Sequence, residues 1–219
     1  GVPNDIFVPV IGGKEVGADL LNLPLNGIFF TGSYPTGLNI AQSAAKKLMK
    51  VQLELGGKDP VYVCEDADAK SVAAATADGA FYNTGQSCCS VERIYVHQKV
   101  YDKFVASFLE TVKSFKSGDP MSDDTYIGPM TRNQQIHVLE DHIKDALDKG
   151  AKLAMGGQRI AGPGNYFQPT VLLNVTNQMK VMREETFGPV IGIMKVKNDA
   201  EAIELMNDTE FGLTSSVYT

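Results

Sequence analysis

The stretch IFFTGSYPTG, residues 28–37, joins an apolar run of strand length to a glycine turn and then to a proline. Pro35 lies where the first turn of a helix would begin, and its fixed φ and missing N–H both suit that position. Free N–H groups at the start of such a helix can bind an anion such as a pyrophosphate. Taken alone, the stretch is better interpreted as an ordinary βα turn, because it matches neither GxGxxG nor a P-loop.

The same alternation of strand and helix patterns extends on both sides of this stretch. Apolar runs of strand length are separated by segments whose apolar residues recur three or four positions apart, which is the spacing of a helix. We therefore predict an α/β protein with a largely parallel, buried sheet. The predicted strands are residues 27–32, 51–55, 60–64, 93–97, 170–175 and 189–196, and LTSSVYT at 213–219 has the pattern of a further strand.

Three helices can be predicted with their ends. The first runs from Ala69 to about Asn83, with Asp66 and Asp68 placed to cap its N–H groups. The second has an apolar stripe that ends near residues 118–120, and the third extends from Thr131 to a stop at Gly150. The expected buried residues are Val100, Phe104, Val105, Phe108, Val112 and Phe115 in the second helix, and Ile136, Leu139, Ile143, Ala146 and Leu147 in the third. Residues 156–165 are expected to form a loop at the tip of a hairpin-like excursion.

Composition and charge exclude several classes of function. The chain has 219 residues, of which 43% are hydrophobic and 21% charged, as in a folded globular protein of one or two domains. A net charge of -6 argues against binding to nucleic acid or to an anionic membrane surface. No apolar run has the length of a membrane span, and the first residues lack a signal-peptide pattern, so we expect an intracellular, cytoplasmic protein without membrane association.

Cysteine and histidine spacing excludes a disulfide framework and a zinc site. The chain has three cysteines, Cys64, Cys88 and Cys89, and an odd number with two adjacent residues fits a reducing compartment. No CxxC pair is present. His137 and His142 are five positions apart and would lie on different faces of a helix, so we expect no metal site.

Three further stretches carry residues suited to chemistry. Cys88 and Cys89 follow a polar turn, where a thiolate could be favoured by nearby N–H groups, although a free cysteine is commonly a small buried hydrophobe. Glu54 alternates with two leucines on a strand and would act as a general base if partial burial raised its pKa; a solvated glutamate is the simpler interpretation. Glu184 and Glu185 could accept hydrogen bonds from ribose hydroxyls or lie in a solvated turn.

Taken together, these motifs are far more specific than any one of them. The chain resembles the aldehyde dehydrogenase superfamily over essentially its whole length, through FTGSYPTG, LELGGKDP, NTGQSCCSVER and EETFGPV in this order. The resemblance implies a Rossmann-like parallel-sheet fold that is truncated at both ends. Gly56 and Gly57 form a natural bend, so we expect residues 1–57 to be the C-terminal part of a nucleotide-binding domain and residues 58–219 an incomplete catalytic domain.

The resemblance also assigns a role to particular residues. In the GQxC pattern the nucleophile is Cys88, while Cys89 is its neighbour without that role. Glu54 matches the general base, and Leu55 is expected near the nicotinamide. Gly32 and Ser33 match the turn that faces the cofactor pyrophosphate, and Glu185 and Phe187 match residues that hold the ribose and border the nicotinamide ring. No metal is expected.

The implied activity is NAD- or NADP-dependent oxidation of an aldehyde to a carboxylic acid. The route passes through a thiohemiacetal and a thioester on Cys88, and Glu54 favours hydrolysis over transfer to coenzyme A. The chain contains no tryptophan and lacks the Trp-Asn-Phe-Pro and Lys-Pro-Ser type segments of the family. We therefore expect a fragment of an enzyme that is a homo-oligomer at full length; the alternative is a non-catalytic binding or structural fragment that retains the fold.

Overall fold

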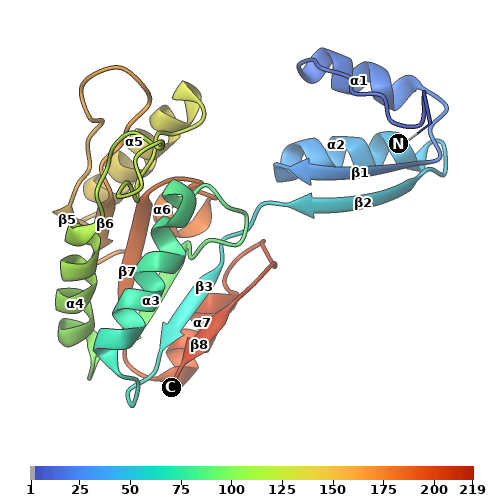
Figure 1. The fold of residues 1–219 in the computed structure, drawn as a ribbon. Coiled ribbons are helices and arrows are strands. Elements are labelled where there is room, and N and C mark those ends of the chain that lie inside the picture. The colour runs from blue at the N-terminus through green and yellow to red at the C-terminus, as the bar shows by residue number, and fades with distance from the viewer. Residues whose placement is uncertain (1–2) are drawn as a thin grey trace. The chain divides into compact units, whose positions relative to one another are not determined.

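The computed structural model describes residues 3–219 and divides the chain into two compact units, Gly1–Gly56 and Gly57–Thr219 (Figure 1). The division falls between the two glycines that follow the second strand. Each unit has its own sheet, and no strand is shared between them. Each unit therefore has its own hydrophobic core, which is small in unit 1 and large in unit 2.

Unit 1 is a βαβ element preceded by a helix. Its elements are α1 (Lys14–Asn22), β1 (Gly27–Gly32), α2 (Tyr34–Ala45) and β2 (Lys50–Leu55). Strands β1 and β2 pair in parallel, from Gly27 opposite Lys50 to Gly32 opposite Leu55. Pro35 lies in the first turn of α2, as its fixed φ predicts.

A close approach of helix to strand holds this element together. A Cβ on Gly37 of α2 would lie 2.5 Å from Cδ2 of Leu55, so glycine is required for the helix to pack this tightly on β2. The buried residues of α2 are Gly37, Ile40 and Ala44, which share one helix face. Leu53 and Leu55 are half-buried on that side of β2, whereas Glu54 is exposed on the other.

Unit 2 is built on a six-stranded sheet in the order β5-β6-β7-β4-β3-β8. All neighbouring strands are parallel except β5 and β6, which are antiparallel. Between β5 and β6 the chain forms the predicted hairpin-like excursion, with a bridge from Arg159 to Phe167. The strands are β3 (Pro60–Val63), β4 (Arg93–His97), β5 (Lys152–Met155), β6 (Thr170–Leu173), β7 (Val190–Val196) and β8 (Ser216–Tyr218).

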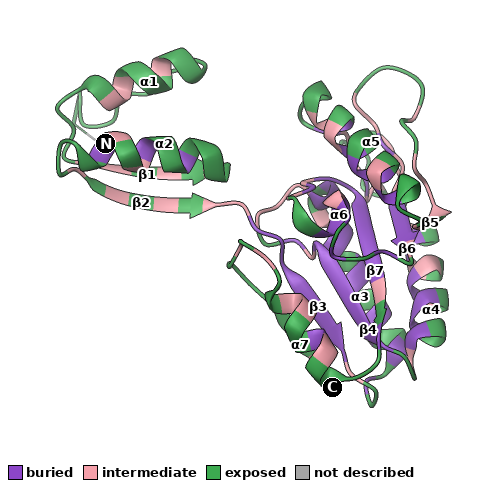
Figure 2. Cartoon of the chain, turned by 180° about the vertical axis from the view of Figure 1, so that it is seen from behind, coloured by how far each residue is buried: buried purple, intermediate pink, exposed green. Residues whose placement is uncertain are grey.

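Helices cover both faces of this sheet. One hydrophobic cluster joins α3 (Ala69–Phe81) and α4 (Tyr101–Ser114) to alternate strand residues such as Val61 and Ile94. The opposite cluster joins α5 (Asn133–Asp148), α6 (Lys180–Arg183) and α7 (Asp199–Asn207) to the strand residues between them. Because helices cover both faces, every residue of β3 and β4 is buried, as the purple colour of these strands in Figure 2 shows.

The predicted helices are present, with differences at their ends and faces; among these, α5 begins at Asn133 and not at Thr131, and Val100 and Phe115 are only half-buried. Asp68 caps α3 by accepting a hydrogen bond from Lys70 N, but Asp66 instead accepts from Thr219 Oγ1. Helix α4 ends at Ser114, four residues before the predicted stop, because the chain turns to form a bridge between Ser117 and Ile127. Leu147 was predicted to be buried but is 40% exposed.

The reason for the error at Leu147 lies in its position near the end of α5. The other four predicted residues of α5, Ile136, Leu139, Ile143 and Ala146, are buried on a single stripe. At about 100° per residue, Leu147 lies only about 20° around the helix axis from Ile136, at the edge of that stripe. It is the last residue but one of α5, which ends at Asp148. The α5 stop at Gly150 is confirmed, since this residue has a φ of +94° and donates from its N–H to Leu147 O.

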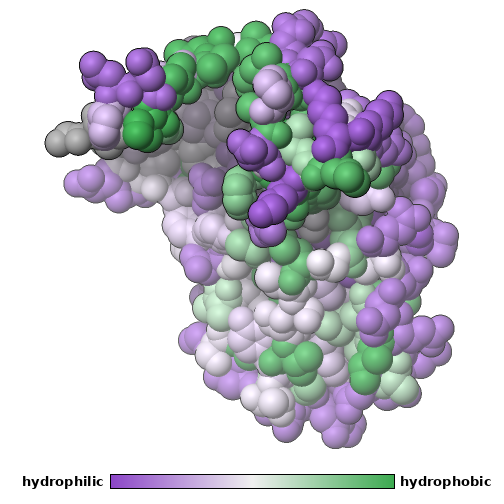
Figure 3. Space-filling view, turned by 90° about the vertical axis from the view of Figure 1, so that its right-hand side faces the viewer, coloured by the Kyte–Doolittle hydropathy of each residue, from purple (hydrophilic) through white to green (hydrophobic). Residues whose placement is uncertain are grey.

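Several large hydrophobic side chains lie on the surface, where Figure 3 shows hydrophobic patches among hydrophilic ones. They concentrate near the beginning of unit 1, where Ile6, Phe7, Val8, Val10 and Ile11 are all more than half exposed. No helix within residues 3–219 combines the length and the apolarity that a membrane crossing requires. Over the same residues, no cluster of three or more His, Cys, Asp and Glu side chains is arranged to hold a metal ion.

Candidate active site

The cysteine pair lies on a sharply bent connection between α3 and β4. After α3 a short 3₁₀ turn (Tyr82–Gly85) places three consecutive residues in the left-handed region, with φ of +50° at Asn83, +60° at Thr84 and +69° at Gly85. A non-glycine residue in this region costs about 1–3 kcal/mol. Such strain persists only where the surroundings fix the backbone, so this bend is a candidate functional feature.

Side-chain hydrogen bonds supply the restraint. Asn83 Nδ2 donates to Gln86 O at 2.8 Å, and Thr84 Oγ1 accepts from Gly128 N at 3.0 Å. Gln86 Oε1 accepts from Thr131 N at 2.8 Å, which ties the bend to the segment that leads into α5. Gln86 of the GQxC pattern therefore acts as a brace for the turn that carries Cys88.

Cys88 is half-buried on this turn. Burial raises the pKa of its thiol, and the neighbouring Cys89 raises it further; the backbone N–H groups of residues 88 and 89 act in the opposite direction but do not prevail. The sequence predicts that these N–H groups stabilise the thiolate. They do contribute in that sense, but desolvation is the larger effect, so the Cys88 thiol is protonated at neutral pH in this state.

Cys89 is in a different environment. It is exposed, and its Sγ lies 3.4 Å from Tyr82 OH and 3.5 Å from Ser87 Oγ. Hydrogen bonds from these two hydroxyls, Ser87 foremost, lower the pKa of the Cys89 thiol. Two adjacent sulfurs thus have opposite pKa shifts, one set by burial and the other by donors.

The segment of Glu184 to Phe187 forms a second tight turn, before β7. Glu185 is half-buried and one of its oxygens accepts a hydrogen bond from Gly57 N at 3.2 Å. Burial raises the pKa of Glu185, and the Gly57 N–H partly opposes this shift. Phe187 has a φ of +47°, which is unusual for an aromatic residue. Glu184 is exposed and its carboxylate lies 3.5 Å from His142 Nε2.

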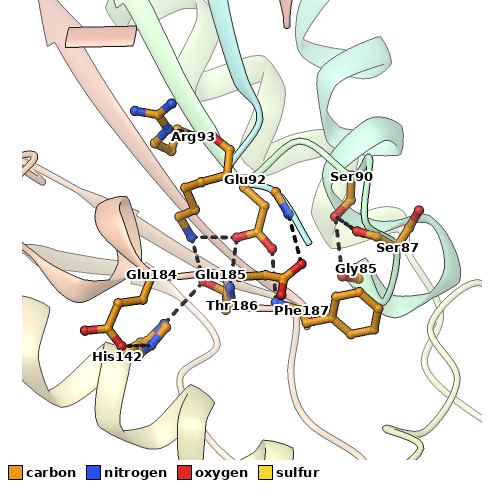
Figure 4. A network of polar contacts seen from close by, with 12 residues as sticks. Gly85, Ser87, Ser90, Glu92, Arg93, His142, Glu184, Glu185, Thr186 and Phe187 are labelled. Atoms are coloured by element: carbon orange, nitrogen blue, oxygen red, sulfur yellow. Dashed lines mark hydrogen bonds and ion pairs between the residues drawn. The ribbon is translucent and has the colours of Figure 1, made fainter. Parts of the chain in front are cut away.

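Backbone contacts bring the cysteine turn, the Glu185–Phe187 turn and Gly57 together within unit 2. A Cβ on Gly85 would lie 2.4 Å from Gly188 O, so the two turns touch directly. A Cβ on Gly57 would lie 2.9 Å from Cys88 O, which places the start of unit 2 against the cysteine itself. Gly85 and Gly188, which are 188 − 85 = 103 positions apart in the sequence, thereby meet beside the turn that carries Cys88. Figure 4 shows Gly85 next to Phe187.

The remaining candidate residues belong to unit 1. Gly32 ends β1, and Ser33 is the N-cap residue of α2, where its Oγ lies 3.0 Å from Thr36 Oγ1. Glu54 is exposed on β2 and accepts a hydrogen bond from Gln52 Nε2 at 3.1 Å, so unit 1 does not provide the partial burial considered for it. Leu55 packs on Gly37. The candidate residues are therefore distributed over both units, with Cys88, Glu185 and Phe187 in unit 2.

A buried polar network behind the Glu185–Phe187 turn was not predicted from the sequence. Lys58 and Glu92 form an ion pair with 2.6 Å between Nζ and Oε2, and their side chains are 0% and 4% exposed. Lys58 Nζ also donates to Thr186 Oγ1 at 2.9 Å, and burial lowers the pKa of Lys58 in spite of its partner Glu92. The sequence does contain a charged pair, Glu92-Arg93, at the start of β4. A single sequence does not show that Lys58 is the partner of Glu92.

The described residues also form pockets in unit 2. One, of about 670 Å³, is lined by residues that include Tyr62, Cys64 and Asp199, and Cys88 is not among its lining residues. Another, of about 450 Å³, has Glu184 and Glu185 in its wall together with Lys180 and Arg183. We give more weight to the second for the site, because Glu185 belongs to the turn that frames Cys88.

Comparison with known proteins identifies the family. Residues 1–219 match the aldehyde dehydrogenase family model. The chain is 43% identical over 223 aligned residues to the 4,4'-diapolycopene aldehyde oxidase of Methylomonas sp, with 100% of this chain and 40% of that protein covered. It is 39% identical to the lactaldehyde dehydrogenase of Escherichia coli, again with 100% of this chain covered and 46% of the relative.

Solved structures agree in fold. The structure of 3,6-anhydro-L-galactose dehydrogenase in complex with NAP superimposes with a TM-score of 0.92 at 40% identity, over 96% of this chain and 45% of that one. This agreement confirms the predicted α/β fold with its mainly parallel sheet. The chain spans less than half the length of the relatives it matches. With a family match along all 219 residues, the chain belongs to the aldehyde dehydrogenase family.

Proposed function

We propose that the protein carrying this chain oxidises an aldehyde to a carboxylic acid with NAD or NADP, and that Cys88 is the nucleophile. The single observation that carries the proposal is the framing of Cys88 by Gly57 and by the Gly85–Gly188 contact, which places the sulfur-bearing turn beside Glu185 and Phe187. Family membership supplies the class of substrate, an aldehyde. The identity of that aldehyde is not part of the proposal.

The residues in both units fit a dinucleotide cofactor. Glu185 has one oxygen on Gly57 N; among residues 3–219 no donor is recorded on the other, so it is available to accept from a ribose hydroxyl. Burial raises the pKa of Glu185 and so disfavours its charged form. A ribose hydroxyl that donates to the second oxygen would offset this cost. In unit 1, the end of β1 at Gly32 leads through Ser33 into the N-terminus of α2, the arrangement that binds pyrophosphate in nucleotide folds.

Cys88 starts the chemistry in this proposal. Its thiol loses a proton to solvent water, and Sγ attacks the aldehyde carbon to form a thiohemiacetal whose oxyanion is stabilised by N–H groups of the turn. The raised pKa of Cys88 means that this deprotonation is a real cost at neutral pH. The bound nicotinamide cofactor supplies acceptance of the hydride that leaves this carbon, after which Cys88 carries a thioester.

Glu54 is proposed to complete the reaction as a general base. Its carboxylate takes a proton from water while that water attacks the thioester, which releases the carboxylic acid and returns Cys88 to the thiol. The exposure of Glu54 on β2 gives it access to water, and its bond from Gln52 orients the carboxylate. Leu55 is proposed to lie near the nicotinamide, and Phe187 to border the same ring.

The domain roles follow the same proposal. Residues 1–57 supply the end of a nucleotide-binding domain, and residues 58–219 supply most of the catalytic domain. A homo-oligomeric, cytoplasmic enzyme remains the expectation for the complete protein. The competing proposal is a non-catalytic member that keeps the fold, and it is favoured if the complete protein binds neither cofactor nor aldehyde.

Activity of the complete polypeptide tests the proposal. We expect aldehyde-dependent formation of reduced cofactor, followed by its absorbance, and a loss of about 10³-fold or more in Cys88→Ser. The matched variant Cys89→Ser should stay within about threefold of the wild type, because that sulfur has no step to perform. Activity that survives Cys88→Ser and disappears in Cys89→Ser would reverse the assignment.

Glu54 has a separate test. In Glu54→Gln we expect one equivalent of reduced cofactor to form in a burst and turnover to stop, because the thioester forms but is not hydrolysed. Glu15→Gln serves as the matched control, since Glu15 is exposed on α1 of the same unit and has no step in the proposed reaction. Unchanged steady-state turnover in Glu54→Gln would exclude this residue as the base.

A further inference from the structure

The buried carboxylate of Glu92 contacts the backbone of the Glu185–Phe187 turn at two points. Glu92 Oε1 accepts a hydrogen bond from Phe187 N at 3.0 Å, and Oε2 accepts from Thr186 N at 3.2 Å. Both oxygens are therefore used by consecutive backbone N–H groups, as the dashed lines in Figure 4 show. A carboxylate is well suited to this because it is an acceptor at both oxygens, whereas an amide accepts at only one.

Charge balance explains how this carboxylate can be buried. Lys58 Nζ lies 2.6 Å from Glu92 Oε2 and also donates to Thr186 Oγ1 at 2.9 Å. Lys58 is in turn fixed by its neighbour, because Arg93 Nε donates to Lys58 O at 2.8 Å. Lys58 Nζ and both oxygens of Glu92 therefore have hydrogen-bond partners. This is the condition under which a buried ion pair is tolerated.

The opposite side of the turn is held by α5. Gln135 Nε2 donates to Thr186 O at 2.7 Å, and His142 Nδ1 lies 3.3 Å from Thr186 Oγ1. Thr186 is thus fixed from both sides and is fully buried. Phe187 differs, because Glu92 is its polar anchor at the residue where the backbone takes a φ of +47°.

We propose that Glu92 is a positioning residue, whose carboxylate holds Thr186 and Phe187 in this conformation so that Glu185 faces the nicotinamide ribose and the Phe187 ring borders the nicotinamide. This inference rests on the proposed function, since it takes Glu185 and Phe187 as the cofactor contacts. Glu92 touches neither cofactor nor substrate in this scheme. Its effect on binding passes through the backbone of the turn.

The test is Glu92→Gln in the complete polypeptide, which keeps the shape of the side chain but removes one acceptor and the charge. We expect the dissociation constant and the KM for NAD(P) to rise about tenfold, while the KM for the aldehyde stays within about twofold. Asp145→Asn is the matched control, because Asp145 also accepts a backbone hydrogen bond, from Lys180 N at 2.8 Å, and its partners are Lys180 and Lys149 and not Thr186 or Phe187. A folded Glu92→Gln protein with unchanged cofactor binding would overturn the inference.

Hydrogen exchange at the amides of Thr186 and Phe187 gives a second readout without cofactor or aldehyde. Exchange at both amides should accelerate about tenfold in Glu92→Gln and remain unchanged in Asp145→Asn. If Glu92→Gln does not fold, the double variant Lys58→Met/Glu92→Gln removes both buried charges and is measured instead. Unchanged exchange contradicts the holding role. Accelerated exchange in Glu92→Gln, together with a wild-type protein that binds no NAD(P), would retain the holding role of Glu92 and reject the proposed function.

Discussion

At the scale of single residues, the two adjacent thiols have opposite pKa shifts, and the more acidic thiol is not the proposed nucleophile. Cys89 is exposed and has a lowered pKa because Ser87 and Tyr82 donate to its sulfur, whereas the pKa of Cys88 is raised by burial. Reaction with an alkylating agent follows the thiolate fraction. The residue most easily modified is therefore not the proposed nucleophile, whose advantage would be its placement beside Glu185 and Phe187.

We expect iodoacetamide at pH 7 to modify Cys89 faster than Cys88 or Cys64, since the thiolate is the reacting form and a lowered pKa increases its fraction. The pKa of Cys64 is also raised by burial. Peptide mass spectrometry after short exposures measures the three rates. Ser87→Ala should slow the labelling of Cys89 and leave Cys64 unchanged. Faster labelling of Cys88 than of Cys89 in the unliganded protein would contradict this account.

A second residue-scale effect concerns acid stability. His142 is almost fully buried, and burial followed by the charge of Lys58 lowers its pKa to about 4. The groups around it are Asp141, Asp145 and Lys180, with Glu184 at 3.5 Å from Nε2. Because Glu184 is exposed, its attraction for a protonated imidazole is screened and does not reverse the effect of burial.

The sign of the pH dependence follows from this lowered pKa. Between pH 6.5 and about 4 the unfolded chain binds a proton at His142 that the folded chain does not, so the free energy of unfolding decreases as the pH falls through that range. The loss amounts to about 3 kcal/mol at most. Urea unfolding at pH 7 and pH 4.5 measures it. His142→Gln should reduce the difference in unfolding free energy between the two pH values, whereas His137→Gln, at an exposed position, should not. An equal difference in the wild type and both variants would refute the prediction.

At the scale of secondary-structure elements, one buried arginine joins β4 to α7. Arg93 is 0% exposed, and its guanidinium donates to Leu205 O at 3.3 Å, to Met206 O at 3.0 Å and to Tyr95 OH at 3.2 Å. The carbonyls of Leu205 and Met206 lie in the last turn of α7, where carbonyl groups lack partners within the helix. The side chain thus satisfies a helix end from the adjacent strand.

We expect Arg93→Met to lower the free energy of unfolding by about 3 kcal/mol or more, because it leaves several buried acceptors without donors. Arg183→Met provides the control. Arg183 is partly exposed and pairs with Asp208 at 3.7 Å, so its loss should cost no more than about 1 kcal/mol. Chemical denaturation of the two variants measures the difference. A stabilised Arg93→Met protein would mean that the desolvation of the guanidinium outweighs its hydrogen bonds.

The elements that the sequence predicts well are those with a regular pattern of apolar residues. The stripe of α4 and the runs of β3 and β4 are fixed by burial on one or both faces, and their positions agree with the structure. The stop of α4 and the exposure of Leu147 depend on neighbouring segments, which have no local pattern. The antiparallel pairing of β5 with β6 likewise depends on the hairpin-like excursion of residues 156–169 between them.

The candidate site has the same limit. The motif around Cys88 can be recognised from its letters, but the ion pair of Lys58 and Glu92 joins residues that are distant in the sequence. A lysine and a glutamate are ordinarily assigned to the surface. Only the fold brings them together and buries them, and a hydrogen-bond network of this kind has no signature in a single chain.

At the scale of the whole molecule, the two units differ in how much they can contribute to their own stability. In unit 2, both faces of a six-stranded sheet are covered by helices, and two hydrophobic clusters result. In the described part of unit 1, three residues are buried, Gly37, Ile40 and Ala44, and the sheet has two strands. An isolated two-stranded element is marginal in water, because the apolar area it buries hardly offsets the loss of chain entropy.

We therefore expect residues 57–219 to fold without residues 1–56, whereas residues 1–56 alone should show no cooperative unfolding. The thermal transition of the 57–219 protein should lie within about 5 °C of the main transition of the 219-residue chain, because its clusters use residues of unit 2 only. Circular dichroism and calorimetry of the three proteins measure this. Ile40→Asp in the 219-residue chain is a matched test, since it introduces a charge into the small unit 1 core and should leave the main transition in place. If Ile40→Asp or removal of residues 1–56 abolished that transition, the large unit would depend on the small one for its stability, and the description of two separately stabilised units would be wrong.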